Sequence, residues 1–147
     1  MPIPIEDFLT VSEEQDVIEA IRIAEENTSG EIRVHIENSA NGDLNHRALE
    51  VFATLKMHNT RLRNGVLIYV AVKDRAFAIY GDQGINNVVP DDFWDSTKSI
   101  IESDFKNGAF SKGLVAGIKN AGQQLKAHFP VDDENPDELS NEISSII

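Results

Sequence analysis

The sequence predicts an α/β fold in which a mainly parallel sheet is covered by helices on both faces. Three observations lead to this prediction. Residues 66–72 form an almost unbroken apolar run, which is typical of a central strand buried on both sides. A segment of alternating apolar and polar residues precedes this run, and another apolar, β-rich segment follows it. Segments with helical periodicity lie before, between and after these strands.

The first predicted helix begins near residue 12. Ser12 is its expected cap, and Gln15, three residues later, would complete a capping box. The apolar positions that share one face of this helix are Val17, Ile18, Ile21 and Ala24. Residues 27–30 end the helix, and we expect Gly30 to adopt a left-handed conformation there.

The first strand and the link that follows it come next. Residues 32–36 place apolar side chains at every second position, which predicts a half-buried strand. Residues 38–43 have the composition of a loop, and a helix follows that starts near Asp43 or Asn45. Because this link to the central strand is long and contains a helix, we expect a right-handed parallel crossover.

The three residues 73–75 connect the central strand to a strand over residues 76–80. So short a link predicts that the two strands are antiparallel. A loop is expected from residue 81 to residue 90, and Asp91 or Asp92 is the expected cap of the next helix. The predicted buried face of that helix consists of Trp94, Ile101 and Phe105, and the residues expected to flank it are Phe93, Thr97 and Ile100.

The last long helix is predicted to begin at Ser111. Its apolar positions are Leu114, Val115, Ile118, Ala121 and Leu125. Gly113, Gly117 and Gly122 interrupt it, although glycine inside a helix costs about 1 kcal/mol relative to alanine. Three such glycines predict that this helix packs closely on the sheet or on another helix.

The chain length of 147 residues fits one domain, which we place at residues 1–130. Residues 131–147 form an acidic C-terminal tail. Asn135 and Pro136 have the pattern of a helix start, and apolar residues then recur every four positions, at Leu139, Ile143 and Ile147. We therefore expect a short helix in the tail that docks on the domain.

Composition excludes several classes of protein. A net charge of −12 argues against bulk attraction to nucleic acid or to an anionic membrane. No apolar run approaches the ~20 residues that a membrane span needs, so we expect no membrane insertion. The N-terminus lacks the basic start and apolar core of a secretory signal, which leads us to expect a cytoplasmic protein. The absence of cysteine excludes disulfides and thiolate metal sites.

No motif for a catalytic nucleophile or a phosphate-binding loop is present. The four histidines, His35, His46, His58 and His128, are scattered, and each is expected to lie at the surface or at a helix end. The one basic stretch, residues 56–63, is expected to be a solvated helix end and loop rather than a phosphate site.

Carboxylates are the better candidates for a site. Asp74 lies in the turn at the carboxyl end of the central strand, the edge where ligands gather in open α/β sheets. Asp91, Asp92 and Asp95 cluster at a helix start. Ca²⁺ and Mg²⁺ prefer several oxygen ligands, and carbonyls of residues 81–87 would add to these carboxylates. The other interpretation is that these are ordinary cap and turn residues. Asp82 is left out of the predicted set, because a strand of about 17 Å separates it from Asp74.

Several segments together resemble the TPM domain family. Residues 63–71, with the sequence RNGVLIYVA, resemble the family's "NGVL" strand, and residues 73–79 resemble its acidic turn and the strand that follows. The other matching segments are residues 29–32, 81–85 and 88–91, and residues 110–114 with Gly117. The matches occur in the family's order and cover roughly residues 12–128.

The resemblance implies an αβα sandwich with a Rossmann-like mixed sheet. It also implies a divalent-cation site, often for calcium, and acid phosphatase activity in some members. Asp74 matches the family's turn aspartate, and Asp91 or Asp92 matches the aspartate at the start of the following helix. The sequence departs from the family at Asp82, where many relatives carry an aromatic residue. Most relatives also carry a signal peptide and a membrane anchor, so the chain looks like a short soluble branch.

Two functions follow from these expectations, and whether the chain is an enzyme is left open. In the first, it is a cation-binding interaction or regulatory module without turnover, with Asp74, Asp91, Asp92 and Asp95 as the metal ligands. In the alternative, it is a metal-dependent acid phosphatase whose Ca²⁺ or Mg²⁺ polarises a phosphoryl oxygen. The expected partners are a divalent cation and, for the alternative, a phosphorylated small molecule or protein. Arg75 is then the nearest phosphate-binding cation.

Overall fold

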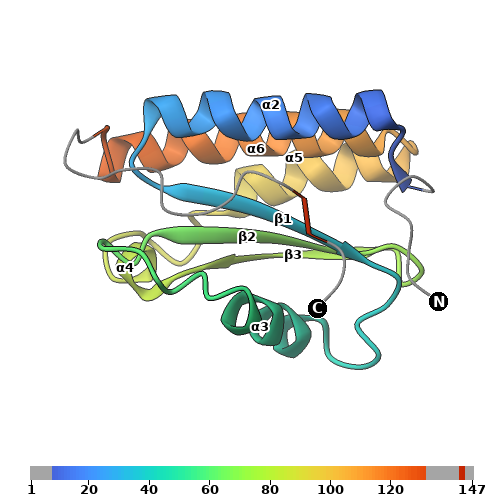
Figure 1. Ribbon diagram of the computed structural model, residues 1–147, viewed down its shortest axis with the longest axis horizontal. Coiled ribbons are helices and arrows are strands. Elements are labelled where there is room, and N and C mark those ends of the chain that lie inside the picture. The colour runs from blue at the N-terminus through green and yellow to red at the C-terminus, as the bar shows by residue number, and fades with distance from the viewer. Residues whose placement is uncertain (1–7, 132–142, 145–147) are drawn as a thin grey trace.

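A computed structural model of the chain describes residues 8–131 and 143–144. Figure 1 shows a small sheet between two layers of helices. The elements in chain order are α2 (Val11–Asn27), β1 (Glu31–Glu37), α3 (Leu44–Thr54), β2 (Gly65–Ala71), β3 (Ala76–Gly81), α4 (Gln83–Asn86), α5 (Asp95–Lys106) and α6 (Phe110–His128).

The sheet has three strands in the order β1-β2-β3. β1 and β2 are parallel, and their register runs from the pair Glu31 and Gly65 to the pair Glu37 and Ala71. β3 is antiparallel to β2, as the three-residue link predicts. Every residue of β2 is buried, because strands flank it on both sides and helices cover both of its faces. The predicted α/β fold and its central strand are confirmed, but the sheet is mixed, with one parallel and one antiparallel pair, rather than mainly parallel.

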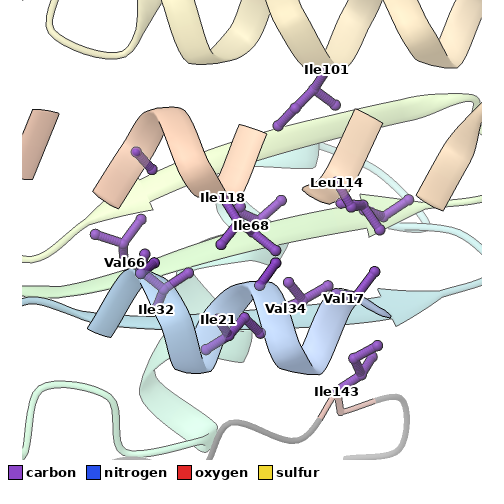
Figure 2. Packing of buried hydrophobic residues seen from close by; sticks show 14 of the residues in the cluster. Val17, Ile21, Ile32, Val34, Val66, Ile68, Ile101, Leu114, Ile118 and Ile143 are labelled. Atoms are coloured by element: carbon purple, nitrogen blue, oxygen red, sulfur yellow. The ribbon is translucent and has the colours of Figure 1, made fainter. Parts of the chain in front are cut away.

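Helices cover the sheet unequally. α2, α5 and α6 lie on one face, and α3 lies on the other (Figure 1). Figure 2 shows side chains from the strands and from the three-helix layer meeting in the main core. The residues labelled there from the helices are Val17, Ile21, Ile101, Leu114 and Ile118, and those from the strands are Ile32, Val34, Val66 and Ile68. The layers therefore form the αβα sandwich that the family resemblance implies.

The glycines of α6 allow the close packing that their positions predict. A Cβ atom on Gly117 would lie 2.5 Å from Cγ1 of Ile101 in α5. A Cβ atom on Gly122 would lie 2.9 Å from Cβ of Ala24 in α2. Both contacts are with helices rather than with the sheet.

The ends of α2 differ from the prediction. Thr10, not Ser12, is the N-cap, and its hydroxyl accepts a hydrogen bond from the Glu13 backbone N at 3.1 Å. The Glu13 carboxylate accepts one in return from the Thr10 backbone N at 2.9 Å, so the capping box lies two residues earlier than expected. Gly30 has no positive φ. Its missing side chain instead leaves room for Leu125, whose Cδ1 would lie 3.0 Å from a Cβ atom there.

The segment after β3 also differs from the prediction. The expected loop contains the short helix α4. Asp82 caps this helix, because its carboxylate accepts a hydrogen bond from the Gln83 backbone N at 2.7 Å. α5 starts at Asp95, so Asp91 and Asp92 lie in the preceding turn and do not cap it. Ser111 does not cap α6, because the helix already begins at Phe110.

Buried side chains on α5 differ in part from those predicted. Ile101 is buried as expected, and Thr97 is buried beside it. Trp94 and Phe105 are only partly buried, and both pack against the edge of the main core. The buried face of α5 is therefore centred on Thr97 and Ile101, and Thr97 is more buried than a flanking position predicts.

Three residues of the C-terminal tail lie within the described part of the chain: Val131, which is exposed, and the pair Ile143 and Ser144. Ile143 is buried in the main core, where Figure 2 shows it close to Val17 and Val34. Ser144 pairs with β1 in a parallel bridge, because its backbone N donates to the Val34 carbonyl at 3.0 Å and its carbonyl accepts from the Ile36 backbone N at 2.9 Å. Residues 143–144 are therefore not helical, contrary to the predicted tail helix, whereas Leu139, Ile147 and the rest of that helix lie outside the described residues.

Among the helices that the structure describes, none combines the length and the hydropathy needed to cross a membrane.

Candidate functional site

The loops after β1 and β2 meet at the carboxyl edge of the two parallel strands. Asp74, in the turn after β2, binds the loop after β1 directly. Its carboxylate accepts from the Ser39 hydroxyl, which lies 2.9 Å and 3.0 Å from the two oxygens. It also accepts from the Ala40 backbone N at 2.9 Å. Asp74 therefore lies where the sequence predicts, and in this structure it holds two loops together.

The other predicted metal ligands lie near the start of α5. Asp91, Asp92 and Asp95 are all exposed. Their neighbour Trp94 packs against Gly81. The contact is close, since a Cβ atom added to Gly81 would lie 3.4 Å from the indole nitrogen. Gly81 is the last residue of β3.

The structure does not bring Asp74 together with these three aspartates. Asp74 precedes β3, whereas the start of α5 lies beside the other end of that strand. A strand of six residues spans about 17 Å at ~3.3 Å per residue. Because β3 is antiparallel to β2, it returns the chain from the carboxyl edge to the opposite edge before α5 begins. The same argument that excludes Asp82 from the predicted set thus applies to Asp91, Asp92 and Asp95.

The described residues at this edge therefore offer few ligands for a divalent cation. In residues 8–131 and 143–144, no group of three or more His, Asp or Glu side chains is placed to hold a metal ion. Asp74 retains some accepting capacity, because the single hydroxyl hydrogen of Ser39 cannot satisfy both carboxylate oxygens at once. The four predicted ligands do not form one site, and Asp74 alone would offer one carboxylate to a hydrated ion.

Asp82 and Arg63 form an ion pair at the opposite edge of the sheet. Arg63 donates to both carboxylate oxygens, from Nε at 2.8 Å and from Nη2 at 3.0 Å. The Asp82 side chain is only 4% exposed, and it also caps α4. Asp82 is therefore a structural residue, and Arg63 is paired rather than solvated as the sequence suggests.

A polar cluster that the sequence does not reveal lies under α3. Its centre is Glu37 at the end of β1, whose carboxylate accepts hydrogen bonds from three side chains. Arg47 of α3 donates from Nε at 2.8 Å and from Nη2 at 2.9 Å. His35 donates from Nε2 at 3.0 Å, and the Tyr69 hydroxyl donates as well. We call His35, Glu37, Arg47 and Tyr69 the Glu37 cluster.

Hydrogen-bonding chemistry determines the protonation of this cluster. Burial alone would raise the pKa of Glu37, but the hydrogen bonds from Arg47, Tyr69 and His35 outweigh burial and hold that pKa at about 2. Burial lowers the pKa of His35, and the bond to Glu37 only partly opposes this. Because a carboxylate only accepts, Nε2 of neutral His35 carries the proton, and Nδ1 accepts from the Ser144 hydroxyl at 2.8 Å.

His35 corrects the expectation that each histidine lies at the surface or at a helix end. It lies in the middle of β1, fully buried, and its ring stacks on Tyr69 at a centroid distance of 5.9 Å. The alternating pattern assigns it to a solvated face, but Tyr69, Glu37 and Ser144 surround its ring there. One signal was present in the sequence: Tyr69 is a polar-tipped residue inside the most apolar strand, and a buried tyrosine hydroxyl requires a partner.

Comparison with known proteins gives a consistent result. The sequence model of the TPM domain matches residues 5–124. The NMR structure of BA42 from the psychrophilic bacterium Bizionia argentinensis is similar, with 57% identity, a TM-score of 0.90, and coverage of 96% of this chain and 97% of that one. The comparison with curated proteins found no match.

Two more distant solved structures share the fold. The N-terminal domain of a P. gingivalis protein has 19% identity and a TM-score of 0.68, over 83% of this chain and 79% of that one. The N-terminal domain of the cg2496 protein from Corynebacterium glutamicum has 12% identity and a TM-score of 0.63, over 94% of this chain and 81% of that one. At these identities the similarity shows the fold alone.

Proposed function

Because the chain belongs to the TPM domain family, we propose that it acts as a binding or regulatory module without turnover of its own, at the carboxyl edge of its sheet. The observation that carries the proposal is that the carboxylates at this edge are already bound. Glu37 accepts from three side chains, and Asp74 accepts from Ser39 and Ala40. Groups held in this way are suited to fixing the shape of a surface.

The protonation of the Glu37 cluster supports the same proposal. A general acid or base works best when its pKa lies near the working pH. The pKa of Glu37 is about 2, and burial together with the bond to Glu37 raises the pKa of Tyr69 above its ordinary value. His35 is fully buried, so no substrate reaches its ring. The cluster therefore stabilises the edge without exchanging protons near neutral pH.

The ligand that we propose for this edge is a divalent cation, Ca²⁺ or Mg²⁺, bound by Asp74 with water in the remaining positions. Mg²⁺ in particular is often held by one or two carboxylates and keeps several waters. Lys73 and Arg75 flank Asp74 and oppose a cation, so we expect a weak Kd, on the order of millimolar. Asp91, Asp92 and Asp95 take no part in this site.

A titration with two matched variants tests the cation proposal. Backbone amide shifts are followed by NMR as Ca²⁺ or Mg²⁺ is added at constant ionic strength, for the wild type, Asp74→Asn and Asp95→Asn. We expect saturable shifts at residues 38–43 and 72–75 in the wild type and in Asp95→Asn, and none in Asp74→Asn. Saturation that is unchanged in Asp74→Asn, or shifts centred on residues 91–95, would contradict the proposal.

The alternative function is a metal-dependent acid phosphatase. Arg75 favours it, because its guanidinium lies next to Asp74 in sequence and has no ion pair or hydrogen bond among the described residues. A bound metal would supply a Lewis acid at this edge. Hydrolysis of p-nitrophenyl phosphate with and without Mg²⁺ distinguishes the two functions. Turnover in the wild type that disappears in Asp74→Asn would show that the chain is a phosphatase and not a binding module without turnover.

A further inference from the structure

An apolar cavity of about 790 Å³ lies between the sheet and the end of α5. The turn after β2 and the first residues of β3 form one wall, and the connection from α5 to α6 forms another. The cavity lies on the face of the sheet opposite the Glu37 cluster, because Val70, Val72 and Phe77 belong to the core under the three-helix layer. Its volume falls in the range of about 300–1,000 Å³ that is usual for small-molecule sites.

Four phenylalanine rings line this cavity: Phe8, Phe77, Phe105 and Phe110. They contact one another mostly edge to face. The centroids of Phe77 and Phe105 are 5.6 Å apart at an interplanar angle of 70°, and those of Phe105 and Phe110 are 5.4 Å apart at 78°. A wall of phenyl rings favours a flat aromatic guest, which can join the same edge-to-face pattern.

Among the described residues, the charged side chains that line the cavity leave one positive charge uncompensated. Lys106 is paired with Glu102, with Nζ 3.3 Å from the carboxylate. Arg75 also lines the cavity, and within the described part of the chain its guanidinium has no ion-pair or hydrogen-bond partner. The neighbouring carboxylate of Asp74 is held by Ser39 and Ala40, so it does not neutralise Arg75 directly.

We propose that this cavity binds an aromatic monocarboxylate, with its rings among the phenylalanines and its carboxylate on Arg75. A guanidinium presents parallel N–H donors that match the two oxygens of a carboxylate. One uncompensated positive charge matches a monoanion better than a phosphate dianion. This site needs no cation at Asp74, so it stands independently of the proposed function.

An NMR titration of the full chain with 2-naphthoate, and with its neutral analogue 2-naphthamide, tests the site. We expect saturable shifts at Phe77, Phe105 and Phe110 with naphthoate and much weaker binding of the amide. Arg75→Gln should weaken naphthoate binding by roughly tenfold or more, the loss expected for a hydrogen-bonded charge, and should leave amide binding unchanged. Lys73→Gln removes the same charge from an exposed position in the same turn, outside the cavity lining, and should bind like the wild type.

Three results would overturn the proposal. The first is no saturable shift with naphthoate, and the second is equal affinity for the acid and the amide. The third is equal weakening in Arg75→Gln and Lys73→Gln, which would assign the effect to net charge alone. NOEs between the methyl groups of residues 1–7 and Phe105, together with absent naphthoate binding, would assign the cavity to the chain's own N-terminal segment and so reject the proposal.

Discussion

Glu37 and Arg47 join the end of β1 to α3 through two parallel hydrogen bonds, from Nε at 2.8 Å and from Nη2 at 2.9 Å. The pair links the sheet to α3, the helix that the described residues place on that face. Its side chains are 14% and 27% exposed, so water screens it only partly.

We predict that Glu37→Gln destabilises the protein by about 2–3 kcal/mol. The substitution keeps the shape but removes the hydrogen-bonded counter-charge of the half-buried Arg47, which keeps only the more distant and exposed carboxylate of Glu50 at 3.8 Å, and breaking such pairs is costly. Urea unfolding at pH 7 measures the change. Glu19→Gln is the matched control, because Glu19 pairs with Arg22 on the exposed face of α2 and should leave the midpoint unchanged. Equal effects of the two variants would mean that the Glu37 cluster is not a stabilising element.

Acidification should weaken the fold in two steps. The pKa of His35 is lowered by burial below its ordinary value of 6.5, so the unfolded chain takes up that proton first and stability falls as the pH drops below about 6.5. The pKa of Glu37 is depressed from 4.5 to about 2 in the folded state, so its contribution is present above about pH 4.5 and is lost between there and pH 2.

Urea unfolding of the wild type and of His35→Gln at several pH values separates these two steps. The variant should lose the slope between pH 7 and 5.5 and keep the slope below pH 4.5. The readout is the pH dependence, so a lower stability of the variant does not affect the test. A wild type whose stability is flat from pH 7 to 5.5 would contradict the assignment of neutral His35.

Gly117→Ala should destabilise the protein by about 1–3 kcal/mol, even though alanine is the better helix former. The new Cβ atom would lie 2.5 Å from Cγ1 of Ile101, so α5 and α6 would have to separate. Thermal unfolding checks this, with Lys119→Ala at an exposed position of α6 as the control that should not change. A stabilised Gly117→Ala would show that helix propensity outweighs packing at this contact.

Ile143→Ala should destabilise the protein by about 2–3 kcal/mol, the usual cost of emptying a largely buried isoleucine site. Ile143 is 8% exposed and belongs to the main core. Val131→Ala, at a position that is 56% exposed, provides the comparison and should unfold like the wild type. If both variants unfold alike, the tail is not bound to the body in solution.

Periodicity predicts most of the fold because it depends on local sequence. The apolar run at residues 66–72 defines a buried strand, and the short link after it makes β3 antiparallel. The ends of the helices are less predictable, since Thr10, Ser12 and the neighbouring acids offer several similar capping arrangements. Which of them forms depends on small differences in local geometry.

The candidate site is harder to predict, because it depends on which edge of the sheet each loop reaches. The position of Asp74 could be predicted, because it directly follows the predicted central strand. That of Asp95 could not, because it depends on whether the segment after β3 returns to the carboxyl edge, and Trp94 instead packs beside Gly81 at the opposite end of β3. His35 and Glu37 have the spacing of solvent-facing residues, and only the structure shows that His35 is buried and that Glu37 is largely enclosed by Arg47 and Tyr69.

The contact between Ala24 and Gly122 has a consequence for how the chain folds during synthesis. α2 is made early, but α6, which packs against it, is made later. The contacting residues Ala24 and Gly122 are 98 positions apart in the chain. At about 5–20 residues per second, the ribosome needs roughly 5–20 s to make that stretch. During this time Val17, Ile21 and Ala24 have no partner from α6. Completion of the three-helix layer is therefore a late event that follows translation of α6.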